Sequence, residues 1–223
     1  MWGHITIRQI SNRIPTMCFG LAGDVWTTAG INKAQLWLHV DHLSVADSPR
    51  LEANSLPTYG FTVEALETCE SIADVAALLR RIDREDGMIL VVVDGKSDLG
   101  AVFECSCSDF AESHFDSEYL VRTNHALVIP DGTTNEDDRP LNTRRRYRRL
   151  DNLLSKRYSQ GGNGPSKAEL IGFLADDEVE RRGKDFATAY SVVACPALKN
   201  IWYTLGGYPA ASAGRWQTVK WAW

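Results

Sequence analysis

The sequence lacks the features that mark several classes of protein. Its five cysteines are odd in number and scattered along 223 residues, which argues against a disulfide framework. No apolar run approaches the roughly 18–20 residues that span a bilayer. The start of the chain has no basic region followed by an apolar core, as a signal peptide would. These absences predict a cytoplasmic protein that does not bind membranes.

An excess of basic charge is also missing. The chain holds 24 Lys and Arg against 29 Asp and Glu, a net charge of −5, which argues against nucleic acid as the main partner. The one basic run, Arg144 to Arg149, follows the acidic segment Glu136-Asp137-Asp138. On a helix these side chains cannot all face one way, so we predict a solvated face with one or two arginines pointing inward. A nucleic-acid module built on this run is the weaker alternative.

Motifs for metals, cofactors and common nucleophiles are absent as well. Cys105-x-Cys107 is the one close cysteine pair, and one intervening residue does not give a zinc-ligand spacing. No Walker loop, dinucleotide fingerprint or Gly-x-Ser-x-Gly elbow occurs. We therefore predict no metal and no cofactor.

What is present is an alternation of strand and helix patterns. The strand patterns fall at residues 4–10, 36–40, 88–93, 99–105, 119–124, 188–195, 200–205 and 215–223. Helical spacing and capping residues predict helices at residues 62–69, 71–84, 142–157 and 166–174. Strands joined as hairpins with segregated helices predict an α+β fold of two antiparallel sheets with helices outside them.

Some polar residues in this pattern have more than one interpretation. His39 and Asp41 share one face of their strand and His42 points the other way, so we interpret them as polar residues at a strand end. Asn32 and Asn124 each follow a predicted strand or turn, where asparagine is common. Taken singly, none of these positions indicates a reaction.

Six short segments, in order along the chain, carry a resemblance to a known family. They are Gly30-Ile31-Asn32-Lys33-Ala34-Gln35-Leu36, Leu66-Glu67-Thr68-Cys69-Glu70-Ser71, Val93-Asp94-Gly95 with Val102-Phe103-Glu104-Cys105, Arg122-Thr123-Asn124-His125, Thr143-x-x-Arg146, and the closing stretch 188–209. They resemble motifs of the linear-amide C–N hydrolases, the N-terminal-nucleophile group that includes choloylglycine hydrolases and isopenicillin-N acyltransferase-like enzymes. The resemblance runs from about residue 20 to residue 209.

The resemblance implies an αββα sandwich that attacks an amide or thioester carbonyl. In the family an N-terminal cysteine is the nucleophile, and its own α-amine is the base. Asn124 matches the family's oxyanion-hole asparagine, Asn32 matches a second asparagine at that hole, and Arg146 matches the helix arginine that orients the site. The implied partner is a small-molecule amide or acyl-thioester substrate, with no nucleic acid and no membrane; a homo-oligomer is left open.

The match also has departures. Lys33 and Gln35 stand where the family has Glu and Gly, and no segment like the nucleophile strand precedes the matching motifs. We therefore expect residues 1–223 to form one domain of this type that is truncated at its N-terminus and lacks the nucleophile. Cys18, Cys105 and Cys195 do not take the nucleophile's place. The alternative, from another class, is a non-catalytic ligand-binding homologue.

Overall fold

Two antiparallel sheets form the centre of the structure. The computed structural model describes residues 3–50, 52, 55–115, 118–130, 132, 139–161, 164–183 and 187–223. In the seven-stranded sheet every strand pairs with its neighbours along the sequence, and the second sheet has the order β10-β9-β8. The strands are β1 (Gly3–Arg8), β2 (Thr16–Leu21), β3 (Ala29–Asn32), β4 (Leu36–Leu43), β5 (Gly87–Asp94), β6 (Leu99–Cys105), β7 (Phe110–His114), β8 (Val192–Cys195), β9 (Asn200–Leu205) and β10 (Arg215–Val219).

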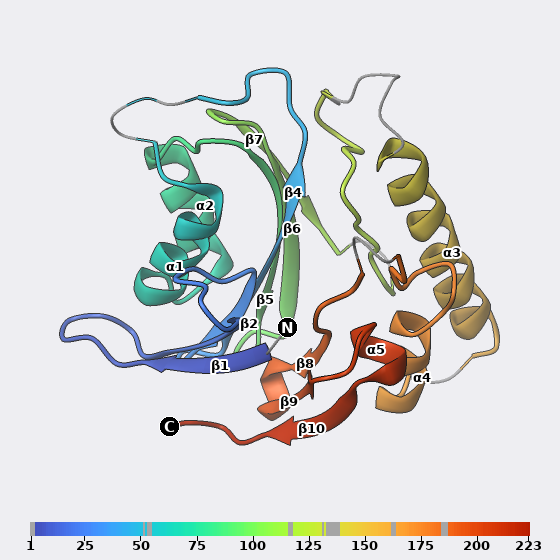
Figure 1. Ribbon diagram of the computed structural model, residues 1–223. Helices are drawn as coiled ribbons and strands as arrows, with labels where there is room; N and C mark the ends of the chain where they lie inside the picture. Colours follow the sequence, from blue (N-terminus) through green and yellow to red (C-terminus); the bar gives the residue numbers. More distant parts are fainter. Residues whose placement is uncertain are drawn as a thin grey trace.

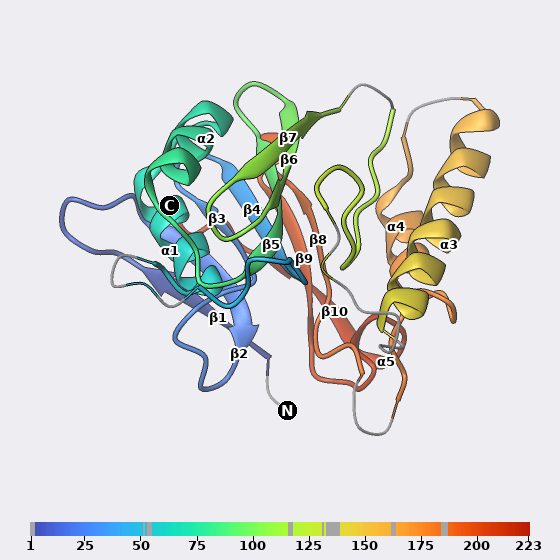
Figure 2. The same cartoon turned by 90° about the horizontal axis from the view of Figure 1, so that it is seen from above.

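Helices cover the outside of both sheets, giving four layers (Figures 1 and 2). The pair α1 (Thr58–Thr68) and α2 (Ile72–Arg81) lies on the outer face of the seven-stranded sheet, and α3 (Arg139–Ser159) and α4 (Lys167–Leu174) lie beyond the smaller sheet. Two short helices, η1 (Pro196–Leu198) and α5 (Ala210–Ala213), flank β9. This arrangement confirms the predicted αββα sandwich. None of the helices described combines the length and apolar character that a bilayer crossing requires.

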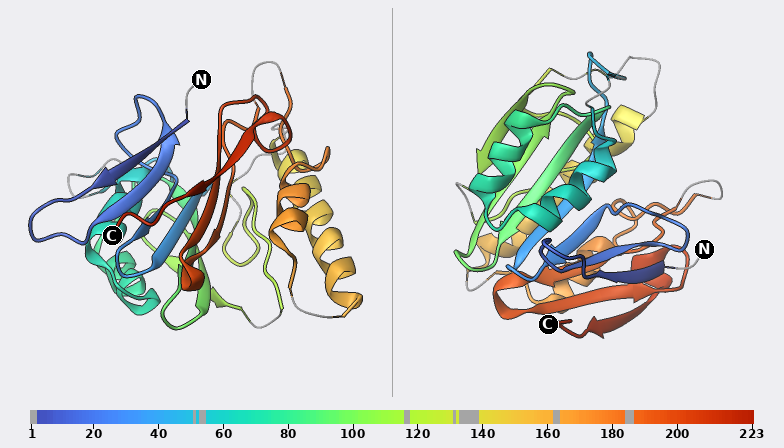
Figure 3. Two further views of the ribbon diagram at one scale, coloured as in Figure 1. Left: turned by 90° about the horizontal axis from the view of Figure 1, so that it is seen from below. Right: turned by 90° about the vertical axis from the view of Figure 1, so that its left-hand side faces the viewer.

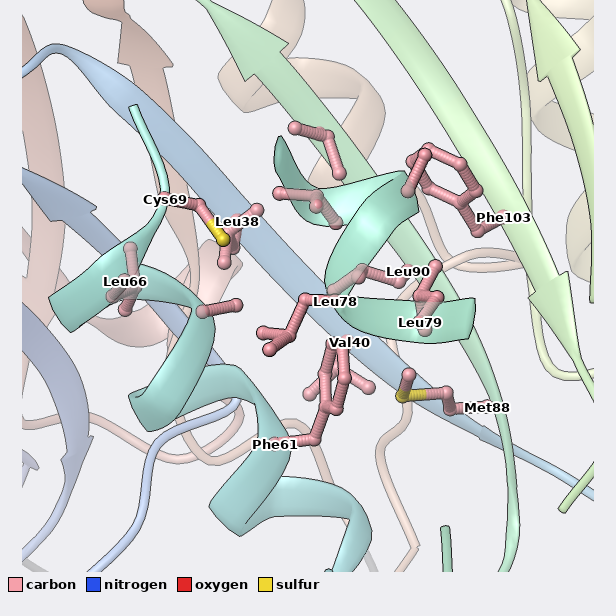
Figure 4. Packing of buried hydrophobic residues seen from close by; sticks show 14 of the residues in the cluster. Leu38, Val40, Phe61, Leu66, Cys69, Leu78, Leu79, Met88, Leu90 and Phe103 are labelled. Atoms are coloured by element: carbon pink, nitrogen blue, oxygen red, sulfur yellow. The ribbon is translucent and has the colours of Figure 1, made fainter. Parts of the chain in front are cut away.

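The first core lies between α1, α2 and the large sheet (Figures 3 and 4). Alternate residues of β4, Leu36, Leu38 and Val40, are buried in it, because successive side chains of a strand point to opposite faces. The predicted start of α2 is confirmed, since the Ser71 hydroxyl accepts a hydrogen bond from the backbone N–H of Asp74 at 3.2 Å. The other face of β4, with Trp37, His39 and Asp41, points away from this core.

The second core lies between the two sheets. Phe19 on β2 and Tyr203 on β9 are fully buried there with ring centroids 5.3 Å apart. The Tyr203 hydroxyl donates a hydrogen bond to the carbonyl of Gly20 at 3.1 Å. The chain after β10 returns to this core, where Trp221 and Trp223 pack against it. The sheets are thus joined along their β1–β3 and β9 portions.

Several sequence predictions need correction. Residues 119–124 are not a strand, and the side chains of Thr123 and Asn124 donate to backbone carbonyls of α3 and β4. The sequence did not predict strands β2, β3 and β7. The glycine-rich composition around β2 and β3 is typical of a loop. Glycine at position 30 instead allows α1 to pack closely on the strand, because a Cβ there would lie 2.6 Å from Leu66 of α1. The acidic segment Glu136-Asp137-Asp138 lies outside the described residues.

Candidate active site

A cavity of about 630 Å³ lies between the large sheet and the layers formed by α3, α4 and β8. Trp37, His39 and Asp41 of β4 form part of its wall, and Val91 and Val93 of β5 pair beside them. The remaining lining is mixed, with polar and apolar side chains: Phe115, Leu120, Arg122, Thr123, Arg146, Leu150, Leu170, Leu174, Val179, Glu180, Thr188, Tyr190, Ser191, Val192, Ala194 and Pro196. A ligand inside would meet apolar surface and a few fixed charges.

The alternation of β4 places an imidazole and a carboxylate side by side on the cavity wall. Nε2 of His39 lies 3.6 Å from Oδ2 of Asp41, and both side chains are about one-third exposed, at 39% and 31%. Burial favours the neutral form of each side chain, whereas the attraction between the imidazolium and the carboxylate favours the charged forms. The pKa of His39 is raised by Asp41 against the effect of burial. The pKa of Asp41 is lowered, because His39, Arg146 and Asn124 outweigh burial. The sequence-based expectation that His39 and Asp41 share a face is confirmed.

Residues 123–125 are clamped onto the first turns of α3. The Thr123 hydroxyl donates to the carbonyl of Thr143 at 3.0 Å, and Nδ1 of His125 lies 3.1 Å from the Thr143 hydroxyl. Both Thr123 and His125 are buried, at 3% and 2% exposure. With its neighbours fixed in this way, Asn124 is held between α3 and β4.

Asn124 links the helix arginine to the strand. Its Oδ1 accepts a hydrogen bond from Nη2 of Arg146 at 2.9 Å, and its Nδ2 donates to the carbonyl of His42 at 3.0 Å. Nε of Arg146 donates to Oδ1 of Asn142, one turn earlier in α3, at 3.0 Å. The cavity lining includes Arg146 but not Asn124. Asn124 therefore orients a guanidinium group that faces the cavity.

A buried carboxylate holds the segment that carries Asn124. Glu104 on β6 is 1% exposed, and its Oε2 accepts backbone N–H groups of Leu127 at 2.9 Å and Val128 at 2.8 Å. Its Oε1 lies 3.3 Å from Nε of Arg122, a cavity-lining residue of the same segment. One side chain thus accepts backbone N–H groups that follow Asn124 and pairs with the arginine that precedes it.

A second buried carboxylate, Glu180, also lines the cavity. Its Oε1 accepts the backbone N–H groups of Ala211 at 2.6 Å and Ser212 at 3.0 Å, and its Oε2 lies 3.2 Å from Arg182. This carboxylate is therefore occupied by α5 and by an arginine. Arg122 and Glu180 are thus each engaged by an ion pair with a residue outside the lining. Among the described charged residues of the wall, this leaves His39, Asp41 and Arg146.

Asn32 lies in a different part of the molecule from Asn124 and Arg146. It is fully buried, and its Nδ2 donates to the carbonyls of Leu66 at 2.9 Å and Cys69 at 2.7 Å. Its Oδ1 accepts the backbone N–H of Leu36 at 3.0 Å. Both amide hydrogens thus hold the end of α1 against the β3–β4 turn. The structure brings together two of the three site residues expected from the sequence.

None of the described residues that line the cavity is a cysteine. Burial raises the pKa of Cys69 to about 11, that of Cys105 to about 12 and that of Cys107 to about 11. Burial also raises the pKa of Cys18. Thiols with these pKa values are almost entirely protonated at neutral pH and are poor nucleophiles. Within the described residues, no three His, Cys, Asp or Glu side chains converge as a metal ion requires.

Comparison with known proteins identifies the family of the chain. Residues 16–207 match the model of the acyl-coenzyme A:6-aminopenicillanic acid acyl-transferase family. The chain belongs to this family. The family assignment agrees with the resemblance carried by the sequence motifs. Among curated proteins, no significant match was found.

Solved structures show the same fold at low sequence identity. A variant of conjugated bile acid hydrolase from Clostridium perfringens matches with a TM-score of 0.63 at 12% identity, over 98% of this chain and 89% of that chain. Penicillin V acylase from Agrobacterium tumefaciens matches with a TM-score of 0.59 at 15% identity, over 92% and 74% of the two chains. The Caenorhabditis elegans ortholog of N-acylethanolamine-hydrolyzing acid amidase matches with a TM-score of 0.60 at 11% identity, over 88% and 81%. The fold is that of the N-terminal-nucleophile hydrolases.

The interpretation of His39 and Asp41 as polar residues at a strand end missed that both side chains line the cavity. The signal was present, because both lie at the same parity as Trp37 on a strand whose other face is Leu36, Leu38 and Val40. What the sequence did not contain was the position of α3, which brings Arg146 toward Asp41.

Proposed function

We propose that this family member hydrolyses or transfers the acyl group of a linear amide or thioester bound in the cavity between the sheets. The observation that carries the proposal is the presence of Arg146 and Asp41 on a mixed apolar and polar cavity wall, with Asn124 bonded to Arg146 behind it. The fold is shared with bile acid hydrolase and penicillin V acylase, which supports amide chemistry as the reaction class.

Arg146 is suited to bind the carbonyl oxygen of the substrate. Attack on a carbonyl places negative charge on its oxygen, and fixed N–H donors stabilise that charge. A guanidinium carries five N–H groups, and in the described part of the chain Asn142 and Asn124 take two of them. Because Asn124 is not among the lining residues of the cavity and one hydrogen of its Nδ2 goes to the carbonyl of His42, we assign the carbonyl contact to Arg146 and the orientation of Arg146 to Asn124.

The test is the turnover of a chromogenic acyl amide by the purified chain and two variants. Arg146→Gln removes the charge at the cavity, whereas Arg145→Gln removes an exposed charge from the next position of the same helix. We expect a fall in kcat/KM of about 100-fold or more for the first, in the range of a lost oxyanion donor, and less than threefold for the second. Equal activity of both variants contradicts the proposed site.

Non-catalytic ligand binding is the second candidate function. It is favoured by the absence of a cysteine from the described cavity wall and by the raised pKa values of the buried thiols. Under this alternative, an acyl amide raises the Tm of the chain without being cleaved. Product formation in the same samples, followed by mass spectrometry, separates the two functions.

A further inference from the structure

A second cavity, of about 940 Å³, lies next to the first one. The two cavities share three lining residues, which are Val93 of β5, Phe115 after β7 and Ala194 of β8. Beyond them the second cavity extends along the hairpin of β5 and β6 to Ile72 at the start of α2 and Tyr158 near the end of α3. Because the cavities meet at the shared residues, a ligand of sufficient length can occupy both.

The place where the cavities meet depends on a glycine. Trp37, Val93 and Gly100 are paired across β4, β5 and β6, so all three lie on the sheet face that borders the cavities. Gly100 has no side chain, and the ring of Phe115 lies directly on it, because a Cβ at position 100 would overlap this ring. Phe115 is 40% exposed, so its ring presents apolar surface between the two cavities.

This meeting point lies some way from the reacting end of a substrate. Trp37, the partner of Val93, is four residues before Asp41 on β4, and a strand rises roughly 3.3 Å per residue, so the distance along the sheet is about 13 Å. An extended chain of single bonds advances about 1.2 Å per bond, so roughly 11 bonds cover this distance. A hexanoyl group whose carbonyl is bound by Arg146 beside Asp41 therefore ends inside the first cavity, whereas a dodecanoyl group reaches the second.

The second cavity combines apolar surface with charges of one sign. Ile72, Leu99 and the Phe115 ring provide hydrocarbon surface. The described lining contains no Lys or Arg but four carboxylates: Asp94, Asp98, Glu112 and Glu118. Nε2 of His114, the one histidine of the described lining, lies 3.2 Å from Oε1 of Glu112. This cavity therefore repels a negative charge, whereas a hydrocarbon chain gains from leaving water there.

We propose that the second cavity binds the far end of an uncharged, unbranched acyl chain of about 12 carbons, and that Phe115 determines the specificity for chain length. This inference rests on the proposed function and specifies the acyl group of its substrate. The acyl group is the part that a linear amide and a thioester have in common, so a subsite for it serves both kinds of substrate. The carbonyl oxygen lies at Arg146, and the alkyl chain runs along Val91 and Val93 of β5 to Phe115.

The test measures binding to the full chain by isothermal titration calorimetry, so it does not depend on turnover. N-dodecanoylbutylamine and N-butanoyldodecylamine have the same composition and carry the long chain on opposite sides of the amide. We expect the first to bind at least tenfold more tightly, because its chain enters the second cavity from the carbonyl carbon. The monobutylamide of dodecanedioic acid, with a carboxylate at the end of the same chain, is expected to bind at least tenfold more weakly than N-dodecanoylbutylamine.

Two variants test whether the chain passes Phe115. Phe115→Glu places a charge at the meeting point, so we expect the Kd of N-dodecanoylbutylamine to rise at least tenfold and that of N-hexanoylbutylamine to change less than twofold. Unchanged binding of the shorter amide shows that the variant is folded. Leu198→Glu is the matched control, because Leu198 is apolar, 69% exposed on η1 and absent from the described lining of both cavities. It is expected to bind both amides like the wild type.

The outcomes separate this inference from the proposed function. Equal binding of the two isomeric amides, tighter binding of N-butanoyldodecylamine, or a Phe115→Glu chain that binds N-dodecanoylbutylamine like the wild type overturns the acyl-chain site and leaves acyl transfer standing. Turnover is measured separately, as the amine released from the same amides and followed by mass spectrometry. A wild-type chain that shows the binding preference but cleaves no acyl amide or thioester contradicts the proposed function alone.

Discussion

Asn124 and Arg146 are 22 residues apart in sequence and joined by a hydrogen bond of 2.9 Å between Oδ1 and Nη2. The contact connects the segment that follows β7 with the second turn of α3. Since Asn124 also donates to the carbonyl of His42, it ties the helix to the strand that carries His39 and Asp41. The geometry of the cavity wall therefore depends on one amide side chain.

The first prediction concerns this amide. Asn124→Ala removes the acceptor that orients Arg146, and a displacement of about 1 Å at a reacting group costs on the order of 100-fold in rate. We expect kcat for an acyl amide to fall by about that factor. Asn152→Ala, an exposed position on α3, provides the control and is expected to retain the wild-type rate. An Asn124→Ala enzyme with unchanged kcat means that Arg146 is held by other contacts.

The second prediction concerns the buried carboxylate of Glu104. Glu104→Gln keeps the shape of the side chain but leaves Arg122, whose side chain is 11% exposed, without its charge partner. Breaking a buried pair in this way costs about 3–5 kcal/mol of unfolding free energy. Urea denaturation measures it, and Glu112→Gln on the neighbouring strand β7 is the control. A loss no larger than that of Glu112→Gln shows that the backbone N–H groups alone hold the segment.

The third prediction is a pH dependence of stability from the start of α2. The backbone N–H of Glu70 lowers the pKa of Asp74, with help from Ser71. A carboxyl whose pKa is lowered by folding stabilises the protein above its unfolded value, about 4, and that stabilisation is lost as the pH falls through the folded value. We expect the free energy of unfolding of Asp74→Asn to depend less steeply on pH in this acid range than that of the wild type. Parallel curves for the two proteins contradict this.

The fourth prediction concerns the aromatic end of the chain. Trp221 and Trp223 pack on the core between the sheets, with ring centroids 5.6 Å apart, and Nζ of Lys199 lies 5.5 Å from the Trp221 ring. Trp221→Ala is expected to cost about 1–3 kcal/mol of unfolding free energy, as for a partly buried aromatic side chain. Trp26→Ala, at a residue 48% exposed, is expected to cost less, and thermal unfolding compares the two. A larger loss for Trp26→Ala would show that the chain end contributes little.

Local features of the fold were predictable from the sequence. The Ser71 and Ser166 caps, the helical spacing of α2 and the buried run of β5 depend on residues close together in the chain, and each is present in the structure. Helix geometry also predicted that one or two arginines of the basic run point inward, and the family motif singled out Arg146; in the structure Arg146 lines the cavity while Arg145 and Arg148 are exposed.

Features that depend on distant residues were not predictable. Residues 119–124 have a strand-like composition, yet Arg122 pairs with Glu104 on β6 and Thr123 bonds to Thr143 on α3. Asn32 fits a family motif by sequence, but the carbonyls at the end of α1 take both hydrogens of its amide. The interaction of Asp41 with Arg146 required the position of a helix about 100 residues later in the chain.

The neighbour-to-neighbour order of the seven-stranded sheet has a consequence for how the protein folds. Each pairing from β1 to β7 joins strands that are consecutive in the sequence, and the longest of these connections, residues 44–86 between β4 and β5, is still far shorter than the 183 residues between Tyr203 and Gly20. We expect the meander and its helices to gain protection from hydrogen exchange before β8–β10 and α3 dock onto them. The first compact species then holds the Leu38 and Phe61 core but no enclosed cavity, so ligand binding reports on the final step of folding.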